Sequence, residues 1–102
     1  MKVYLDDERQ TPDGWERTFT VEGTIALLQT LAVTHLSLDN DLGEGQPEGY
    51  KVLDWLEETV YFDHSFPLPI ISVHSANASR VEYMKRAALN IERIRQQQVG
   101  GA

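Results

Sequence analysis

The sequence predicts a single α/β domain built on a parallel β-sheet. Short apolar runs alternate with segments of helical periodicity, the order typical of parallel strands joined by helical crossovers. The 102 residues suit one domain, and no internal repeat or linker divides them. Hydrophobic residues make up 41% and charged residues 25% of the chain, which is ordinary for a globular protein. We expect the domain to span residues 1–96 and a disordered tail to follow at residues 97–102.

The first half of the chain contains two predicted strands and one helix. Residues 2–5 form a short apolar strand that acidic residues terminate. Residues 11–14 read Thr-Pro-Asp-Gly, a turn sequence because proline presets φ and glycine accepts a positive φ. A weaker strand follows at residues 15–19. Thr20 is a suitable N-cap for a helix whose apolar stripe continues to about residue 32.

The second half contains two further strands and two helices. Residues 35–38 lead into an acidic cluster, and a loop rich in glycine and proline then precedes a helix that begins at Tyr50. Residues 68–74 are almost continuously apolar, as expected of a strand covered on both faces. Ser79 can cap the final helix.

Charge and composition exclude several classes of function. The net charge of −7 argues against binding duplex DNA, which requires a basic surface, but it permits a nucleotide or an RNA end at a local site. The absence of cysteine excludes disulfides, thiolate chemistry and sulfur-ligated zinc. The N-terminus becomes acidic after five residues, too early for a signal peptide, and no apolar run approaches the ~20 residues that span a bilayer. We therefore expect a cytoplasmic protein without membrane contact.

Polar side chains follow three of the four predicted strands. Residues 6–8 (Asp-Asp-Glu) and residues 39–41 (Asp-Asn-Asp) follow the first and third strands, and residues 74–77 (His-Ser-Ala-Asn) follow the fourth. In a sheet of order 2-1-3-4 these segments meet at one edge, although periodicity does not fix that order. Two carboxylates about 5 Å apart repel by roughly 3 kcal/mol at an effective dielectric near 20. A divalent cation relieves this repulsion, and Mg²⁺ is the divalent cation that oxygen ligands usually bind.

The acidic clusters are either a metal site or solvated strand ends. As a metal site they offer Asp6, Asp7 and Asp39 as ligands. Asp41 is either a further ligand or an acceptor for loop backbone. Both readings stay open on the residues alone, although two clusters at neighbouring strand ends favour the Mg²⁺ hypothesis.

The residues after the fourth strand also have two readings each. His74 is either a hydrogen-bonded structural histidine or a general acid–base, because imidazole titrates near neutral pH. Ser75 and Asn77 either bind phosphate oxygens at the N-terminus of the final helix or cap that helix. Arg80 either binds a phosphate or pairs with a surface acid such as Glu82.

Four sequence blocks, taken together, resemble a known family. They are residues 5–9 (LDDER), 36–43 (LSLDNDLG), 49–50 (GY) and 73–77 (VHSAN). In this order they resemble the cyclic-phosphate-processing receiver-like domain, a relative of two-component receiver domains. The resemblance covers nearly the whole chain. It implies a truncated receiver-like (flavodoxin-like) fold with a four-stranded parallel sheet of order 2-1-3-4 and about three helices.

The resemblance also implies roles for individual residues. Asp6 and Asp7 match the acidic pair that binds Mg²⁺ in receivers, and Asp39 matches the phosphoacceptor. Nothing after residue 80 reads as a fifth strand, so the lysine that receivers place there has no counterpart, which argues against phosphotransfer. Family members often carry histidine where this chain has Asn40.

These observations predict a Mg²⁺-dependent phosphoesterase-like domain that processes a cyclic phosphate on a nucleotide or an RNA end. Asp39 and His74 are the expected catalytic residues, and Ser75, Asn77 and Arg80 are the expected phosphate ligands. The alternative is a non-catalytic, receiver-derived module that binds metal, phosphate or a protein partner, for which the net charge of −7 favours basic partners.

Overall fold

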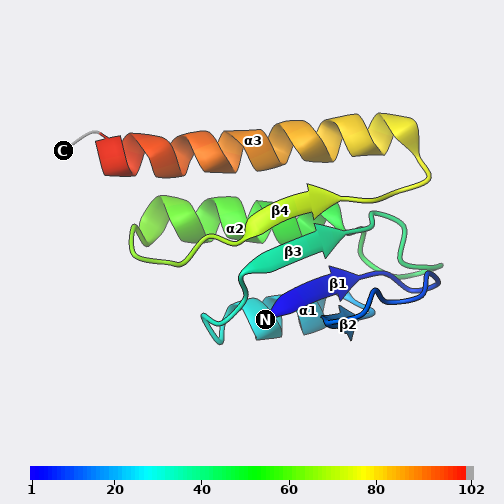
Figure 1. Cartoon of the computed structure of the whole chain (residues 1–102). Helices are drawn as coiled ribbons and strands as arrows, with labels where there is room; N and C mark the ends of the chain where they lie inside the picture. The colour runs from blue at the N-terminus through cyan, green and yellow to red at the C-terminus, as the bar shows by residue number, and fades with distance from the viewer. Residues whose placement is uncertain (101–102) are drawn as a thin grey trace.

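The computed structural model describes residues 1–100, which form four strands and three helices (Figure 1). Residues 101 and 102 lie outside the described part of the chain. In chain order the elements are β1 (Lys2–Leu5), β2 (Trp15–Thr18), α1 (Val21–Leu28), β3 (His35–Leu38), α2 (Tyr50–Phe62), β4 (Ile70–Val73) and α3 (Ala78–Gly100). Within residues 1–100, no helix combines the length and apolarity that crossing a membrane requires.

All four strands are parallel and lie in the order β2-β1-β3-β4, which confirms the predicted topology. Leu5 at the end of β1 is in register with Leu38 of β3, and Leu38 is in register with Val73 of β4. Three strands therefore end at the same level. The segments that follow them meet at one edge of the sheet, as the sequence predicts.

The core lies between the sheet and its helices. One face of the pleat is apolar because alternate residues of each strand point the same way. The fully buried side chains of β1 and β3 on this face are Val3, Leu5, Leu36 and Leu38, and those of the helices include Leu28, Val52, Leu53, Leu56, Val60, Met84 and Ile91. This packing fixes where the strand ends lie.

Among residues 1–100, no helix covers the opposite face of the sheet (Figure 1). Figure 1 shows α1 and α2 together behind the strands, with α3 running along the β4 side. Ile70, at the start of β4, is 65% exposed. The expectation that this strand is covered on both faces is therefore wrong. A continuous apolar run shows that a strand is hydrophobic. Whether its second face is covered depends on how many helical crossovers pass over that face of the sheet.

Two helix boundaries differ from the predictions. Helix α1 begins after Thr20, whose Oγ1 accepts a hydrogen bond from the Gly23 N–H at 3.0 Å, as predicted. It ends at Leu28, earlier than predicted, and Leu31 has a left-handed φ of 66° that a helix cannot accommodate. Helix α3 continues to Gly100, so residues 97–100 are helical and do not belong to a tail. Near its end, the Gln98 side chain donates to the carbonyl of Val60 at 2.8 Å.

Candidate functional site

A cleft of about 510 Å³ opens at the carboxyl edge of the sheet. Its lining comes from the loop after β1, the loop that joins β3 to α2, the loop after β4, and the first turn of α3. The lining residues are Asp6, Asp7, Glu8, Arg9, Asp39, Asn40, Asp41, Gly43, Glu48, Ser75, Ala76, Asn77 and Arg80. Every residue predicted for the site lines this cleft except His74.

Three carboxylates meet in the cleft. Asp6, Asp7 and Asp39 each offer one oxygen, and these oxygens lie within 4.8 Å of one another. Asp6 is fully buried, whereas Asp7 and Asp39 are half-buried. Asp41 is exposed and accepts a hydrogen bond from the Gly43 N–H at 3.2 Å, so it lies on the rim and outside the cluster.

Asp6 is held by hydrogen bonds to both of its carboxylate oxygens. Oδ1 accepts from the backbone N–H groups of Glu8 and Arg9, each at 2.8 Å, and Oδ2 lies 3.0 Å from Nε2 of His74. Burial alone would raise the pKa of Asp6, but these hydrogen bonds outweigh it and lower the pKa below its usual 3.8. Asp6 is therefore ionised and fixed in orientation at neutral pH.

The pKa of Asp39 is shifted in the opposite direction. Burial, and then the negative charge of Asp6, raise the pKa of Asp39 above its usual 3.8, and a hydrogen bond from the Asn40 N–H at 2.8 Å offsets this only in part. The ionised form of Asp39 is thus disfavoured by its surroundings. A set of oxygen ligands with unfavourable mutual repulsion fits a hard divalent cation such as Mg²⁺.

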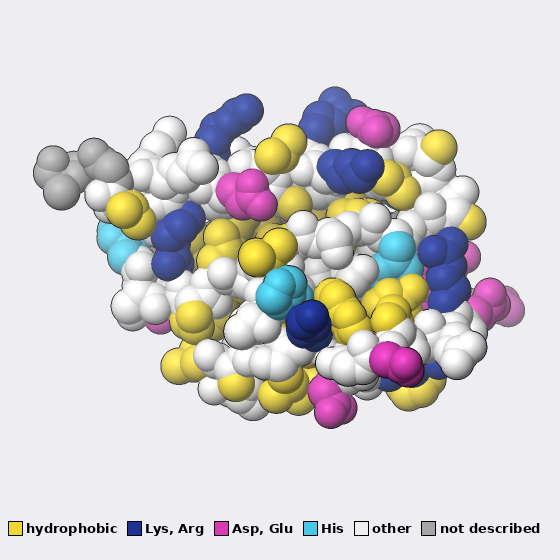
Figure 2. All heavy atoms as spheres, viewed as in Figure 1, with side chains coloured by type: hydrophobic (Ala, Val, Ile, Leu, Met, Phe, Trp, Pro, Cys, Tyr) yellow, Lys and Arg dark blue, Asp and Glu magenta, His cyan; other side chains and the backbone are white. Residues whose placement is uncertain are grey.

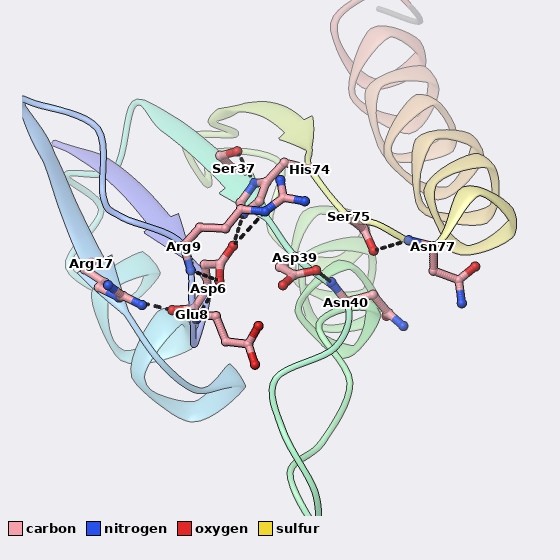
Figure 3. Close-up of polar contacts among 10 residues, drawn as sticks. All are labelled: Asp6, Glu8, Arg9, Arg17, Ser37, Asp39, Asn40, His74, Ser75 and Asn77. Carbon is pink, nitrogen blue, oxygen red and sulfur yellow. Dashed lines mark hydrogen bonds and ion pairs between the residues drawn. The ribbon is translucent and has the colours of Figure 1, made fainter.

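His74 lies behind Asp6 and not in the cleft. Figure 3 shows hydrogen bonds that join Ser37 to His74 and His74 to Asp6. Nδ1 of His74 is 2.6 Å from the Ser37 hydroxyl, and the imidazole stacks on Tyr4 with ring centres 4.2 Å apart. A carboxylate only accepts hydrogen bonds, so Nε2 carries the proton that it shares with Asp6.

The surroundings of His74 favour its neutral form. Burial lowers the pKa of His74 below its usual 6.5, and the hydrogen bond and charge of Asp6 offset this only in part. In the neutral tautomer, Nδ1 accepts from the hydroxyl of Ser37. Both ring nitrogens are then engaged, so this geometry suits a group that orients Asp6. Direct proton transfer by His74 stays a prediction.

The N-terminus of α3 forms one wall of the cleft. Oδ1 of Asn77 accepts from the Arg80 N–H at 3.2 Å and from the Ser79 hydroxyl at 2.9 Å. Asn77 is therefore the N-cap of this helix, and the expectation that Ser79 caps it is wrong. The Ser75 hydroxyl in turn accepts from the Asn77 N–H at 3.2 Å. The side chains predicted to bind phosphate thus also build the wall that presents them.

Arg80 reaches across the cleft. Its guanidinium lies 3.8 Å from a carboxylate oxygen of Glu48, and both side chains are close to half exposed. The sequence suggested pairing with Glu82 or another surface acid, and in the structure this acid is Glu48, in the loop that precedes α2. A long, exposed ion pair of this kind contributes little to stability. The guanidinium is thus readily available to an anion.

The structure adds residues that the sequence reasoning missed. Ser37 orients His74, and Asn40 joins the cleft to α2. The Asn40 side chain accepts from the Tyr50 N–H at 3.2 Å, and its backbone carbonyl accepts from the Gly49 N–H at 2.8 Å. Asn40 is buried. The sequence feature that could have pointed to Ser37 is its position as a lone polar residue within an apolar strand.

Most of the chain is similar to a described protein family. A family model described as the cyclic-phosphate processing receiver domain matches residues 1–90. The matched range includes all four strands and every residue that lines the cleft. Neither the comparison with curated proteins nor that with solved structures gave a significant match.

Proposed function

Because the chain belongs to the family of cyclic-phosphate processing receiver domains, we propose that its cleft binds Mg²⁺ and hydrolyses a cyclic phosphate on a nucleotide or an RNA end. The observation that carries this proposal is the cluster formed by Asp6, Asp7 and Asp39, whose oxygens lie within 4.8 Å of one another. The cluster faces a cleft that also contains cationic and hydrogen-bonding side chains suited to phosphate.

The three clustered carboxylates would hold the metal ion. Its positive charge would offset the burial and repulsion that raise the pKa of Asp39. A bound Mg²⁺ supplies charge stabilisation to the phosphate oxygens during displacement at phosphorus.

Side chains of the cleft would bind the phosphate itself. Arg80 would exchange its long contact with Glu48 for a phosphate oxygen, because guanidinium groups bind phosphate strongly and in a fixed geometry. Ser75 would donate its hydroxyl proton to a second oxygen. Asn77 would keep the first turn of α3 in place and offer its side-chain amide to the same phosphate.

Ring opening requires water, a base and a proton for the leaving oxygen. Water attacks phosphorus, one ring P–O bond breaks, and the released ribose oxygen takes up a proton from solvent. Asp39 would orient the attacking water, and the proton of that water would pass to solvent. His74 holds Asp6 in orientation during this step through the 3.0 Å contact.

The direct test is hydrolysis of a 2′,3′-cyclic nucleotide by the purified protein with Mg²⁺. We expect ring opening that EDTA abolishes and that Asp39→Asn slows by about 10- to 100-fold, because the substitution removes a carboxylate that would hold the metal ion. Asp13→Asn is the matched control because Asp13 is an exposed acid in the turn before β2. Mg²⁺ binding without ring opening by the wild-type protein would contradict the catalytic part of the proposal.

A second candidate is a binding module that holds metal and phosphate without turnover. The engagement of both His74 nitrogens favours it, because the most obvious proton donor is then occupied. Saturable binding of Mg²⁺ and of a nucleoside monophosphate, with no ring opening, would support this candidate.

A further inference from the structure

The uncovered face of the sheet has an unusual composition. The strand register places eight side chains on it in two rows, and none of them is acidic although the chain contains 16 acidic residues. The first row is Trp15, Lys2, His35 and Ile70, and the second is Arg17, Tyr4, Ser37 and Ser72. Figure 2 views this face, where hydrophobic, histidine and basic side chains gather over the strands. We call these eight residues the open sheet face.

Aromatic rings and cations lie next to one another on the open sheet face. The Lys2 ammonium is 5.8 Å from the centre of the Trp15 ring. The same ring meets Tyr4 and His35 edge to face, at centre distances of 6.2 and 6.3 Å. Trp15, Tyr4 and His35 are half-buried, whereas Lys2 and Ile70 are exposed. Part of the ring surface of Trp15 and His35, and the positive charge of Lys2, are therefore available to a ligand.

We propose that the open sheet face binds single-stranded RNA and leads its 3′ end into the cleft. This inference rests on the proposed function and names its substrate class. Exposed aromatic side chains on a four-stranded sheet stack on unpaired bases, and cations beside them attract the phosphate backbone. RNA is the matching polymer because a 2′,3′-cyclic phosphate requires the 2′-hydroxyl of ribose.

The direction of the strands connects the open sheet face to the cleft. Asp6 in the cleft lies four positions after Lys2 in the first row, which corresponds to about 13 Å along a strand. Arg17 continues the basic path, because its Nε–H donates to the backbone carbonyl of Asp6 at 3.2 Å. Arg9 follows at the cleft itself, with its side chain 50% exposed.

The overall charge of the protein favours the open sheet face as the RNA-binding surface. A net charge of −7 repels nucleic acid from most of the molecule. The eight residues of the open sheet face include no acid, and this face lies beside the proposed catalytic cleft. A short, single-stranded segment fits this area, whereas a duplex needs a larger basic surface.

Binding of a short oligouridylate tests the proposal without any turnover. The probe carries a 5′ fluorophore and a free 3′-hydroxyl, and fluorescence anisotropy is recorded in EDTA at low salt. We expect wild-type protein to bind and Trp15→Ala to weaken binding roughly 5- to 100-fold through lost stacking. Lys2→Glu should also weaken binding and lower the slope of log affinity against log salt by about 0.7 or more. Arg93→Glu, the same charge change at an exposed position of α3, should bind as wild type does.

Two results would overturn the proposal. One is wild-type affinity in both Trp15→Ala and Lys2→Glu, with circular dichroism showing that each variant is folded. The other is no binding by the wild-type protein together with a dimer that Trp15→Ala dissociates, which would assign the face to a second copy of the chain. Because the assay contains neither Mg²⁺ nor a cyclic phosphate, its outcome is independent of whether the cleft hydrolyses anything.

Discussion

At the scale of single residues, the pair formed by Asp6 and His74 organises the cleft. Asp6 is fully buried and ionised, which is tolerated because two backbone N–H groups and the His74 imidazole donate to it. His74 in turn is fixed by Ser37 and by its stack on Tyr4. A group with this many contacts is suited to positioning a metal ligand.

A substitution of His74 distinguishes positioning from proton transfer. If His74 positions Asp6, His74→Ala will lower Mg²⁺ affinity by about 10-fold or more, the effect typical of losing an outer-shell partner, and excess Mg²⁺ will restore the rate. If it transfers a proton, kcat will stay low at saturating Mg²⁺. Isothermal titration calorimetry and ring-opening rates over a range of Mg²⁺ concentrations separate these outcomes.

The lowered pKa of His74 predicts a pH-dependent stability in the absence of metal. Because the folded-state pKa lies below 6.5, the folded protein binds fewer protons than the unfolded chain between these two values. The free energy of unfolding should therefore decrease as the pH falls below 6.5 and level off below the folded-state pKa. Urea midpoints in EDTA from about pH 5 to 8 measure this, and His74→Gln should give a flatter profile. The same profile in both proteins would exclude His74 as the source.

At the scale of secondary-structure elements, the start of α2 depends on a close backbone approach. A Cβ at Gly49 would lie 1.8 Å from the carbonyl oxygen of Asp39. This contact is with backbone, so neither side can move without shifting the end of β3. The glycine thus couples the position of the helix to the position of the proposed metal ligand.

Gly49→Ala should accordingly damage both stability and the site. We expect a loss of about 3 kcal/mol or more in unfolding free energy, as in severe overpacking, together with weaker Mg²⁺ binding. Gly45→Ala is the control: a Cβ there meets nothing within 4 Å, and only its positive φ of 77° adds strain. That strain should cost about 1–2 kcal/mol and leave Mg²⁺ affinity unchanged. Equal effects of the two substitutions would refute the coupling.

The cap of α3 permits a smaller, matched test. Asn77→Ala removes the acceptor of the Arg80 N–H and should destabilise the protein by about 1 kcal/mol. Asn90→Ala, at an exposed position within the same helix, should be neutral or slightly stabilising because alanine has the higher helix propensity. Chemical denaturation of the two variants makes the comparison, and an unchanged midpoint for Asn77→Ala would show that the cap contributes nothing.

At the scale of the whole molecule, the proposed metal site predicts stabilisation by Mg²⁺. The carboxylates that would bind the ion come from segments more than 30 residues apart in the chain. The ion would therefore bind the folded state selectively. At a free concentration of 100 times Kd it would add about 2.7 kcal/mol to the free energy of unfolding.

Thermal unfolding provides the measurement. The stabilisation corresponds to a rise of roughly 10 °C or more in Tm for a domain of this size. Asp39→Asn should lose most of the rise, and Asp13→Asn should retain it. A similar rise in both variants would mean that Mg²⁺ acts through the overall negative charge and not through the cleft.

The fold was largely predictable because its signals are local. Apolar runs, helical stripes, the turn before β2 and the Thr20 cap each depend on residues close together in the chain. The four family blocks then supplied the strand order, which the structure confirms. The end of α1 and the extension of α3 to Gly100 were missed, since Leu31 adopts a left-handed φ and Gln98 contacts α2.

The sequence by itself determined that acids, a histidine and small polar residues follow the strands of one parallel sheet, because strand ends can be recognised from hydrophobicity alone. Only the tertiary structure decided which of them share a cleft. It placed Asp6, Asp7 and Asp39 together, left Asp41 on the rim, and turned His74 toward the open face of the sheet. The physical reason is that the contacts of a side chain at a strand end depend on hydrogen bonds from distant segments, which local sequence patterns do not encode.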